Sequence, residues 1–192
     1  MSESLTIQKN DVALEKSNNI QMTVTTRRNL MWKVSNALRY VLPYPRKIYN
    51  YIGIQKSILN HNVNHRFFPF KMGIEASSRC NLKCPLCPRI TLDRAVGDMK
   101  YEDFTKLLDK LSPFLFQVRF HVLGEPTLNP RLPEMINYTH KKGIYTNFHS
   151  NGHFLSDHLI EALIDAGLDE INIAIDGMSQ YTYEQYRVGG FV

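Results

Sequence analysis

The chain has 192 residues, of which 43% are hydrophobic, and it carries a formal net charge of +5. This length suits one domain with a buried core, and no apolar run approaches the roughly 20 residues that a membrane-spanning helix needs. The polar segment 1–16 also lacks the apolar stretch of a secretory signal, so we expect a cytoplasmic protein.

The positive charge is concentrated in the first half of the chain. No acidic residue occurs between Glu15 and Glu75, whereas this stretch contains ten lysines and arginines. Residues 1–26 are rich in Ser, Thr, Asn and Gln, which predicts a disordered polar tail. Residues 27–70 have apolar positions at helical spacing with Lys and Arg between them, which predicts a basic amphipathic helical extension.

The sequence allows three interpretations of what this basic extension contacts. Pro43 and Pro45 would separate it into two short helices, each with one apolar face. Basic amphipathic helices lie on anionic membrane surfaces in some proteins and contact nucleic acid in others. The third interpretation is that the two helices pack against the following domain and keep their charges in water. We favour this packing, retain peripheral membrane contact as an alternative, and rank nucleic-acid binding last.

From residue 71 to the end of the chain, residues 71–192, predicted strands and helices alternate. The strands are Lys71–Ser77, Gln117–Leu123, Ile144–His149 and Glu170–Ile175. The helices are Tyr101–Leu111, a segment from the cap Asn129 and Pro130 to Gly143, a segment from the cap Ser156 to Gly167, and a last helix near Ser179. Strands that alternate with helices of this length indicate βαβ units. The sequence therefore predicts an α/β fold with a parallel sheet and about four βα units.

A loop of unusual composition follows each predicted strand. These loops are Cys80–Cys87, Gly124–Pro126, Ser150–Gly152 and Asp176–Gly177. In parallel α/β folds the carboxyl ends of the strands meet at one rim, and this rim holds the active site. Four separate sequence signals therefore converge on one place. His121 and His149 also lie at strand ends, where we interpret them as structural histidines.

The cysteines point to a metal. Cys80, Cys84 and Cys87 are the only cysteines, and they lie within eight positions of one another. An odd and clustered set does not form a disulfide framework and indicates metal binding in a reducing compartment. Three thiolates on one loop could bind three irons of a cubane cluster and leave the fourth iron open. The alternative is a zinc site with His61, His65 or His121 as the fourth ligand.

The spacing of Cys80, Cys84 and Cys87 is CxxxCxxC, and it follows a predicted strand directly. This resembles the signature of the radical S-adenosylmethionine (SAM) superfamily, whose cysteine loop follows the first strand of a partial (β/α) barrel. Further motifs extend the resemblance over residues 72–190: Gly97-Asp98-Met99, Leu123-Gly124-Glu125-Pro126, Ser150-Asn151-Gly152 and Ile173-Ala174-Ile175-Asp176-Gly177. Leu86 stands where the family often has an aromatic residue, and Ala174 where it often has Ser or Thr.

The resemblance implies an enzyme with two cofactors. Cys80, Cys84 and Cys87 would bind a 4Fe–4S cluster, and its open iron would bind SAM. The reduced cluster would cleave SAM to a 5′-deoxyadenosyl radical, which abstracts a hydrogen atom from the substrate. A reductant such as flavodoxin or ferredoxin would supply the electron. The SAM-binding residues expected from the resemblance are Gly124, Glu125, Pro126, Asn151, Asp176 and Arg187, and no catalytic side chain is assigned.

The resemblance also implies that the core is incomplete. The family barrel has six βα units, whereas residues 71–192 supply about four, so we expect the N-terminal portion of a longer enzyme. The loop Cys84-Pro85-Leu86-Cys87-Pro88 is similar to that of SPASM-type members, which act on peptides or carbohydrate-like alcohols. The substrate stays open. Two other functions also stay open: an inactive fragment that binds the cluster without turnover, and a zinc-stabilised binding module.

Overall fold

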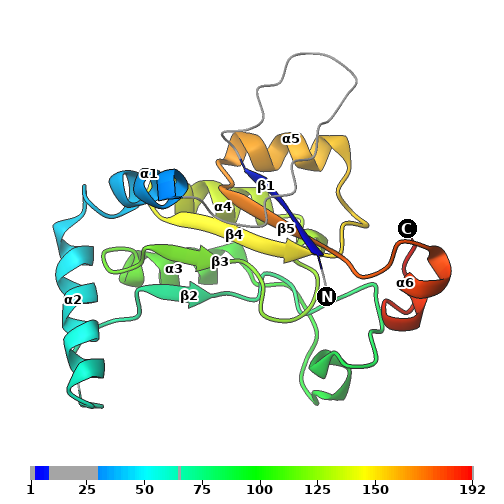
Figure 1. Cartoon of the computed structure of the whole chain (residues 1–192), viewed down its shortest axis with the longest axis horizontal. Helices are drawn as coiled ribbons and strands as arrows, with labels where there is room; N and C mark the ends of the chain where they lie inside the picture. The colour runs from blue at the N-terminus through cyan, green and yellow to red at the C-terminus, as the bar shows by residue number, and fades with distance from the viewer. Residues whose placement is uncertain (1–2, 9–29, 65, 192) are drawn as a thin grey trace.

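The computed structural model describes residues 3–8, 30–64 and 66–191, which form a five-stranded sheet with helices packed on one face (Figure 1). The strands are β1 (Glu3–Gln8), β2 (Lys71–Gly73), β3 (Gln117–Arg119), β4 (Tyr145–Ser150) and β5 (Glu170–Ile175). The helices are α1 (Leu30–Tyr40), α2 (Pro45–Leu59), α3 (Tyr101–Leu111), α4 (Leu132–Lys141), α5 (Asp157–Ala166) and α6 (Gln180–Tyr186). Two 3-10 turns, η1 (Pro88–Thr91) and η2 (Pro126–Leu128), lie in the connecting loops.

The strands stand in the order β1-β5-β4-β3-β2. Strands β2, β3, β4 and β5 are parallel neighbours, and α3, α4 and α5 connect one to the next. This arrangement confirms the predicted α/β fold with about four βα units. Because all four strands run in the same direction, the loops that follow them lie at one end of the sheet, at the right of Figure 1.

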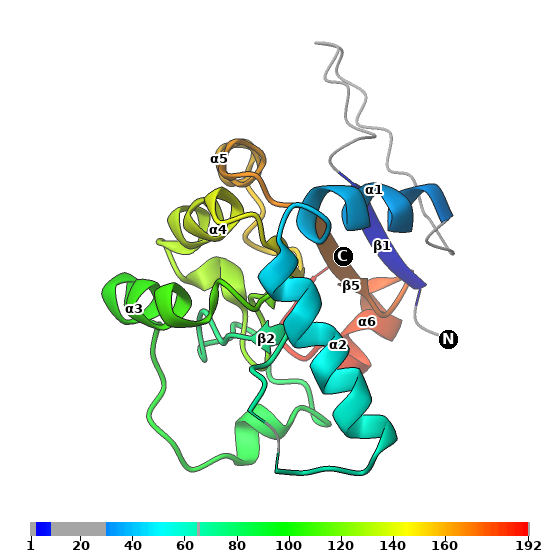
Figure 2. The same cartoon turned by 90° about the vertical axis from the view of Figure 1, so that its left-hand side faces the viewer.

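The core lies between the sheet and helices α3, α4 and α5, which cover the same face (Figure 2). Side chains alternate along a strand, so every second residue of β3 and β4 points into this core. Fully buried members of the core are Phe104, Leu108, Val118, Phe120, Leu132, Met135, Ile136, Ile144 and Phe148. The residues between them, such as Arg119 and Asn147, point to the opposite face of the sheet, which these three helices leave uncovered.

Helices α1 and α2 form the predicted extension and lie at the end where the parallel strands begin, at the left of Figure 1. Pro45 is the first residue of α2, where its missing N–H is tolerated. Contacts tie both helices to the domain: the Tyr40 hydroxyl donates a hydrogen bond to Asp169, and Lys47 Nζ donates one to the carbonyl of Gly143 at 2.7 Å. These contacts are of the kind that the packing interpretation requires. Within the described ranges, no helix combines the length and the apolar character that crossing a bilayer requires.

Part of the N-terminal segment for which we predicted disorder forms a strand. β1 pairs antiparallel with β5 along its whole length, from Glu3 opposite Ile175 to Gln8 opposite Glu170. This pairing satisfies backbone groups along the edge of β5, a long-range effect that the polar composition of the segment could not reveal. The other residues of the predicted tail, 1–2 and 9–26, lie outside the described part of the chain.

Two predicted strands are shorter in the structure. Lys71–Ser77 and Gln117–Leu123 form regular pairs only over their first three residues. For β2 the reason is that the chain after it leaves the ladder and pairs with the segment before α3. Ser77 forms a bridge with Asp98, and the amide of Met99 donates to the carbonyl of Ala76 at 3.0 Å.

The start of α4 also differs from the prediction. The helix begins at Leu132, two residues after Pro130, and its capping residue is Arg131. Asn129 still accepts a hydrogen bond from the Arg131 amide at 2.9 Å, but its amide nitrogen donates to the carbonyl of Ala76 at 2.8 Å. Asn129 therefore joins the start of α4 to the segment that leads into the cysteine loop.

Candidate functional site

The cysteine loop follows β2 at the carboxyl end of the sheet. All three cysteines are free thiols; Cys84 is buried, and Cys80 and Cys87 are partly exposed. A turn in which the amide of Cys87 donates to the carbonyl of Cys84 at 3.0 Å places the last two cysteines side by side along the loop. Pro88 then starts the 3-10 turn η1 and ends the loop. The loop is thus a folded segment and not an extended linker.

Polar hydrogens from three parts of the chain point at the cysteine sulfurs. The amide of Leu82 lies 3.4 Å from Cys80 Sγ, and Asn151 Nδ2 lies 4.0 Å from the same atom. Arg187 Nη1 lies 3.8 Å from Cys84 Sγ. N–H donors around cysteine sulfur tune the charge and potential of iron–sulfur clusters. Their presence at two of the three sulfurs fits a loop whose thiolates bind iron.

The Cys80 thiol is not poised to ionise by itself. Burial raises the pKa of Cys80, and the charge of Glu125 adds to this rise, although the hydrogen bond from Leu82 opposes it. A cysteine nucleophile needs the opposite shift, because the reactive species is the thiolate. A bound metal would supply the positive charge that stabilises the thiolate. The electrostatics of Cys80 therefore suit a metal ligand better than a nucleophile.

The arrangement of donors bears on which metal would bind. Among residues 3–8, 30–64 and 66–191, no three His, Cys, Asp or Glu side chains are grouped so that they could hold one metal ion. A zinc site needs four donors that meet at a single point. In a cubane cluster each thiolate binds a different iron, so the sulfurs need not meet at one point. His61 and His121, named as possible zinc ligands, do not join the cysteines in such a group, and His65 lies outside the described residues.

Gly124 brings the loop after β3 against the cysteine loop. Its φ of 78° lies in the left-handed region that favours glycine. A Cβ at this position would stand 2.2 Å from the carbonyl oxygen of Ser77, which is too close for any side chain. The next amide, that of Glu125, donates to the carbonyl of Arg79 at 2.7 Å. The structure shows Gly124 bracing the residues before Cys80, and its contact with a cofactor stays a prediction.

Glu125 joins two of the predicted loops through its carboxylate. The side chain is 2% exposed. One oxygen accepts hydrogen bonds from the Thr127 amide at 3.3 Å, the Thr127 hydroxyl at 2.7 Å and the Ser150 hydroxyl at 2.8 Å. The other oxygen accepts from the Asn151 amide at 2.9 Å. Pro126, also buried, starts η2 directly after it. Glu125 is therefore a buried, fully hydrogen-bonded carboxylate that fixes the loop after β4.

Asn151 lies between the loop after β4 and the cysteine loop. Its Nδ2 donates to Asn81 Oδ1 at 2.8 Å in addition to its approach to Cys80 Sγ. Its Oδ1 accepts from the amide of His153 at 3.1 Å. The predicted site residues Cys80, Glu125 and Asn151 are thus brought together by direct contacts or by shared neighbours.

Asp176 and Arg187 form an ion pair beside Cys84. Arg187 Nε donates to Asp176 Oδ2 while its Nη1 faces the cysteine sulfur. Burial opposes the charge on the Arg187 guanidinium, but Asp176 more than offsets this effect, so the pKa of Arg187 is raised. The structure therefore places the last two predicted site residues, which come from the segments after β5 and α6, against the cysteine loop.

Sequence reasoning missed the segment after Arg187. The carbonyl of Val188 accepts a hydrogen bond from the Lys83 amide at 2.9 Å, and Gly190 packs so closely on Leu82 and His153 that a Cβ would clash with them. The only signal was the pair Gly189-Gly190, which permits close approach of two backbones. This segment covers the cysteine loop from the side of α6.

Fold and site together define an α/β protein with a three-cysteine loop at the carboxyl ends of its parallel strands. The family model for the radical SAM superfamily matches residues 74–191. The chain therefore belongs to the radical SAM superfamily, whose members are enzymes. Membership implies a 4Fe–4S cluster and SAM, in agreement with the cysteine loop.

Curated relatives match the same region. The tungsten-containing aldehyde ferredoxin oxidoreductase cofactor-modifying protein of Pyrococcus furiosus is 34% identical over 105 residues, which cover 54% of this chain and 30% of that protein. The PqqA peptide cyclase of Rhodopseudomonas palustris is 34% identical over 125 residues, which cover 64% of this chain and 32% of that protein. The matched region is thus less than a third of the length of either relative.

A solved structure supports the fold. The structure of tagged anSMEcpe with bound AdoMet aligns with a TM-score of 0.52 at 23% identity, over 62% of this chain and 35% of that chain. The family match and the four parallel strands identify the sheet as a partial βα barrel of the radical SAM type, and this structure has a similar fold.

Proposed function

We propose that this chain binds a 4Fe–4S cluster through Cys80, Cys84 and Cys87, each of which holds one iron, and leaves the fourth iron for SAM. The single observation that carries the proposal is the folded loop of three free cysteines with N–H donors directed at two of the sulfurs. When bound, the cluster and SAM supply a 5′-deoxyadenosyl radical for hydrogen abstraction. The protein's part is to hold the cofactors and to exclude water.

The six predicted SAM-binding residues divide into three groups. Asn151 and Arg187 approach cysteine sulfurs, so we propose that their remaining polar hydrogens contact SAM. The Glu125 carboxylate is already occupied by four hydrogen bonds, and Gly124 is packed on Ser77. We therefore propose that Gly124, Glu125 and Pro126 present backbone groups to SAM, and that Asp176 acts by orienting Arg187.

For the substrate and the electron donor we propose only a chemical class. One relative is named as a peptide cyclase, which supports a peptide substrate for the complete enzyme; a carbohydrate-like substrate is the second candidate. A flavodoxin or ferredoxin would deliver the electron to the cluster. We place the enzyme in the cytoplasm, where clustered thiols stay reduced.

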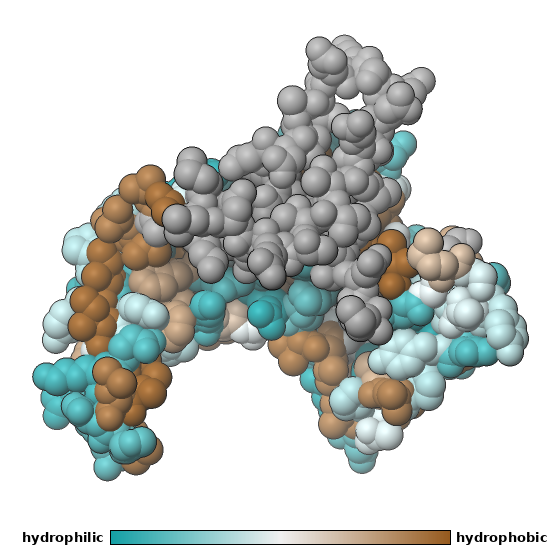
Figure 3. All heavy atoms as spheres, in the orientation of Figure 1, coloured by the Kyte–Doolittle hydropathy of each residue, from teal (hydrophilic) through white to brown (hydrophobic). Residues whose placement is uncertain are grey.

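The basic extension has a second face that the domain does not cover. Figure 3 shows apolar residues gathered on the α2 side of the molecule, where Leu42, Ile52 and Leu59 are exposed. We propose that the extension mainly closes the end of the barrel where the parallel strands begin, through Tyr40 and Lys47. Peripheral contact with a membrane is the alternative for the exposed side.

The test is anaerobic reconstitution of the chain with iron and sulfide. We expect a brown protein with about four irons per chain that binds SAM and releases 5′-deoxyadenosine after reduction. Cys84→Ser should lose iron and product, whereas the exposed neighbour Lys83→Gln should keep both. A brown protein that releases no product would identify an inactive cluster-binding fragment. A colourless protein that binds zinc would identify a binding module and contradict the proposal.

A further inference from the structure

The face of the sheet opposite α3, α4 and α5 is polar along β2, β3 and β4, with Asn147 buried on it and Arg119 exposed. We call it the open face; the side chains on it include Lys71, Gln117, Arg119, His121, Asn147 and His149. Gln117 Nε2 donates to Asn147 Oδ1 at 3.2 Å, and the rings of His121 and His149 stack at 4.1 Å, so neighbouring strands present these groups together. Parallel sheets usually bury apolar side chains on both faces. A polar face inside a partial barrel therefore calls for a polar ligand.

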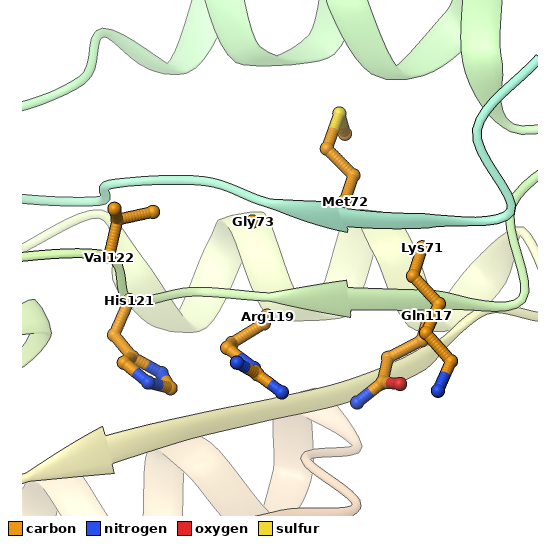
Figure 4. A pocket seen from close by; sticks show the side chains of 7 residues that line it. All are labelled: Lys71, Met72, Gly73, Gln117, Arg119, His121 and Val122. Atoms are coloured by element: carbon orange, nitrogen blue, oxygen red, sulfur yellow. The ribbon is translucent and has the colours of Figure 1, made fainter. Parts of the chain in front are cut away.

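A cavity lies on this face beside β2 and β3. Its volume is about 350 Å³, and its lining is Lys71, Met72, Gly73, Gln117, Arg119, His121 and Val122. Figure 4 shows the side chains of Lys71, Gln117, Arg119 and His121 extending to the same side, whereas Met72 points the other way. This volume lies in the range of small-ligand sites. The cavity is therefore lined by two cations, one amide and one imidazole.

The two cations of the cavity are not neutralised by neighbouring carboxylates. Within the described part of the chain, neither Lys71 nor Arg119 forms an ion pair, and Arg119 is exposed. Two acids border the same face, but both have other partners. Glu75 pairs with Arg94 at 2.7 Å, and Glu170 accepts hydrogen bonds from Tyr145 and Asn172. The positive charge of the cavity is therefore available to a ligand.

His121 adds a neutral donor to these cations. Its Nδ1 accepts a hydrogen bond from the backbone amide of His149 at 3.0 Å, so the ring proton of the neutral form lies on Nε2. Burial, together with the charges of His149 and Arg119, lowers the pKa of His121 to about 3. The ring is therefore neutral at pH 7 and offers an N–H, while its tautomer is fixed by the backbone.

We propose that this cavity binds an anionic group of the substrate, a carboxylate or a phosphate, through Arg119 and Lys71, with His121 as a neutral hydrogen-bond donor. The guanidinium of Arg119 matches two oxygens of such a group, and the ammonium of Lys71 adds a second charge. The inference deepens the proposed function and rests on it. β2 leads into the cysteine loop and β3 leads to Gly124, so an anion held here would direct the rest of the substrate toward the SAM site.

The test is calorimetric titration of the cluster-loaded chain with two probes, inorganic phosphate and glutarate, in the presence of saturating SAM. SAM occupies its own carboxylate site, so the remaining binding reports the open face. We expect one probe to bind more tightly than the other, which identifies the substrate anion. Arg119→Gln should weaken that binding about tenfold or more, and Lys71→Gln several-fold. Circular dichroism melting shows whether each variant is folded.

The matched control is Lys110→Gln, which removes the same charge from the exposed surface of α3 and should leave probe binding unchanged. The inference is wrong if neither anion binds to the unaltered chain. It is also wrong if folded Arg119→Gln and Lys71→Gln bind the anions as tightly as the unaltered chain does. A chain that binds the anion through Arg119 but releases no 5′-deoxyadenosine contradicts the proposed function and leaves the anion site standing. A chain that cleaves SAM but binds no anion supports the proposed function and contradicts the anion site.

Discussion

The two ends of the barrel differ in how they hold a buried charge, as Glu125 at one end and Lys47 at the other show. At the carboxyl ends of the strands, Glu125 is 2% exposed and its oxygens accept four hydrogen bonds. At the opposite end, Lys47 is 1% exposed and donates one hydrogen bond, to the carbonyl of Gly143, while its Nζ lies 4.1 Å from the centre of the Tyr44 ring. Burial lowers the pKa of Lys47 to about 8.

This difference distinguishes the cofactor end of the barrel, which contains Glu125, from the structural end, which contains Lys47 and which we call the scaffold end. The hydrogen bonds of Glu125 come from η2 and from the loop after β4, so they fix the position of one loop relative to another. Directional bonds of this kind specify geometry, which a cofactor site requires. Lys47 donates a single hydrogen bond and otherwise packs on the Tyr44 ring, so fewer directional bonds hold it than hold Glu125. The end of the barrel where the parallel strands begin therefore holds this buried charge with less directional bonding than the cofactor end does.

The strongest test of the comparison is Gly124→Ala. The left-handed backbone would cost alanine about 1–2 kcal/mol, and relief of the clash with the Ser77 carbonyl about 1–3 kcal/mol more. We expect a large loss of unfolding free energy in urea and a loss of iron after reconstitution, because the displaced segment precedes Cys80. The control is Gly97→Ala, since a Cβ at Gly97 meets nothing within 4 Å. Equal effects of both changes would show that Gly124 does not brace the loop.

Glu125→Gln addresses the hydrogen bonds directly. The amide keeps the shape of the side chain, but its NH₂ group would face N–H or O–H donors of Thr127, Ser150 or Asn151 that now donate to the carboxylate. We expect a loss of about 2–3 kcal/mol in urea unfolding, because charged hydrogen bonds are replaced by an unsatisfied pair of donors. Glu134→Gln on the exposed start of α4 is the control and should change stability by less than about 0.5 kcal/mol. If the two variants are equally stable, the network around Glu125 contributes nothing.

The contrast between the two ends also explains which features the sequence could predict. The alternation of strands and helices depends on local periodicity, and the caps of α5 depend on Ser156 and Gly167 alone, so these features were predictable. The four loops after the strands were found because parallel strands must end at one rim. These predictions need no knowledge of which residues meet across the fold.

Features that depend on distant contacts were not predictable. The Glu125 side chain is bonded to residues 25 and 26 positions away, and no local pattern shows this. The pairing of β1 with β5 joins the two ends of the sequence, and the N-terminal composition pointed to disorder instead. Lys47 looked like one more surface charge of a basic extension, since neither Gly143 nor Tyr44 marks it as buried.

Lys47→Met tests the scaffold end through pH. The folded pKa of about 8 lies below the ordinary value of 10.5, so folding disfavours the protonated lysine. This penalty is fully present below pH 8 and is relieved as pH rises toward 10.5, because the unfolded chain then binds the extra proton. The native protein should therefore gain stability from this group between pH 8 and 10.5. Methionine fills a similar volume and should abolish the gain.

The measurement is urea unfolding of both proteins at pH 7.5, 9 and 10.5, taken as the difference between them so that other titrating groups cancel. We expect the advantage of Lys47→Met to shrink as pH rises, by on the order of 2–3 kcal/mol in total. The loss of the hydrogen bond to Gly143 offsets part of this advantage at every pH. A difference that does not vary with pH would show that Lys47 keeps its ordinary pKa. Lys110→Met, on the exposed face of α3, should show no such slope.

Tyr40→Phe is the smallest change and separates packing from hydrogen bonding at the scaffold end. Burial, and then the charge of Asp169, raise the pKa of Tyr40, so the hydroxyl remains a neutral donor to that carboxylate. Phenylalanine keeps the edge-on contact with Tyr145 but removes the donor. Asp169 retains its bonds from the amide and hydroxyl of Thr146 at 2.9 and 3.1 Å, so we expect a loss of only about 1 kcal/mol in urea unfolding. Tyr49→Phe, at a position 72% exposed, is the matched control. If the two variants unfold alike, the hydrogen bond from Tyr40 to Asp169 does not stabilise the protein, and Tyr40 holds α1 through ring packing.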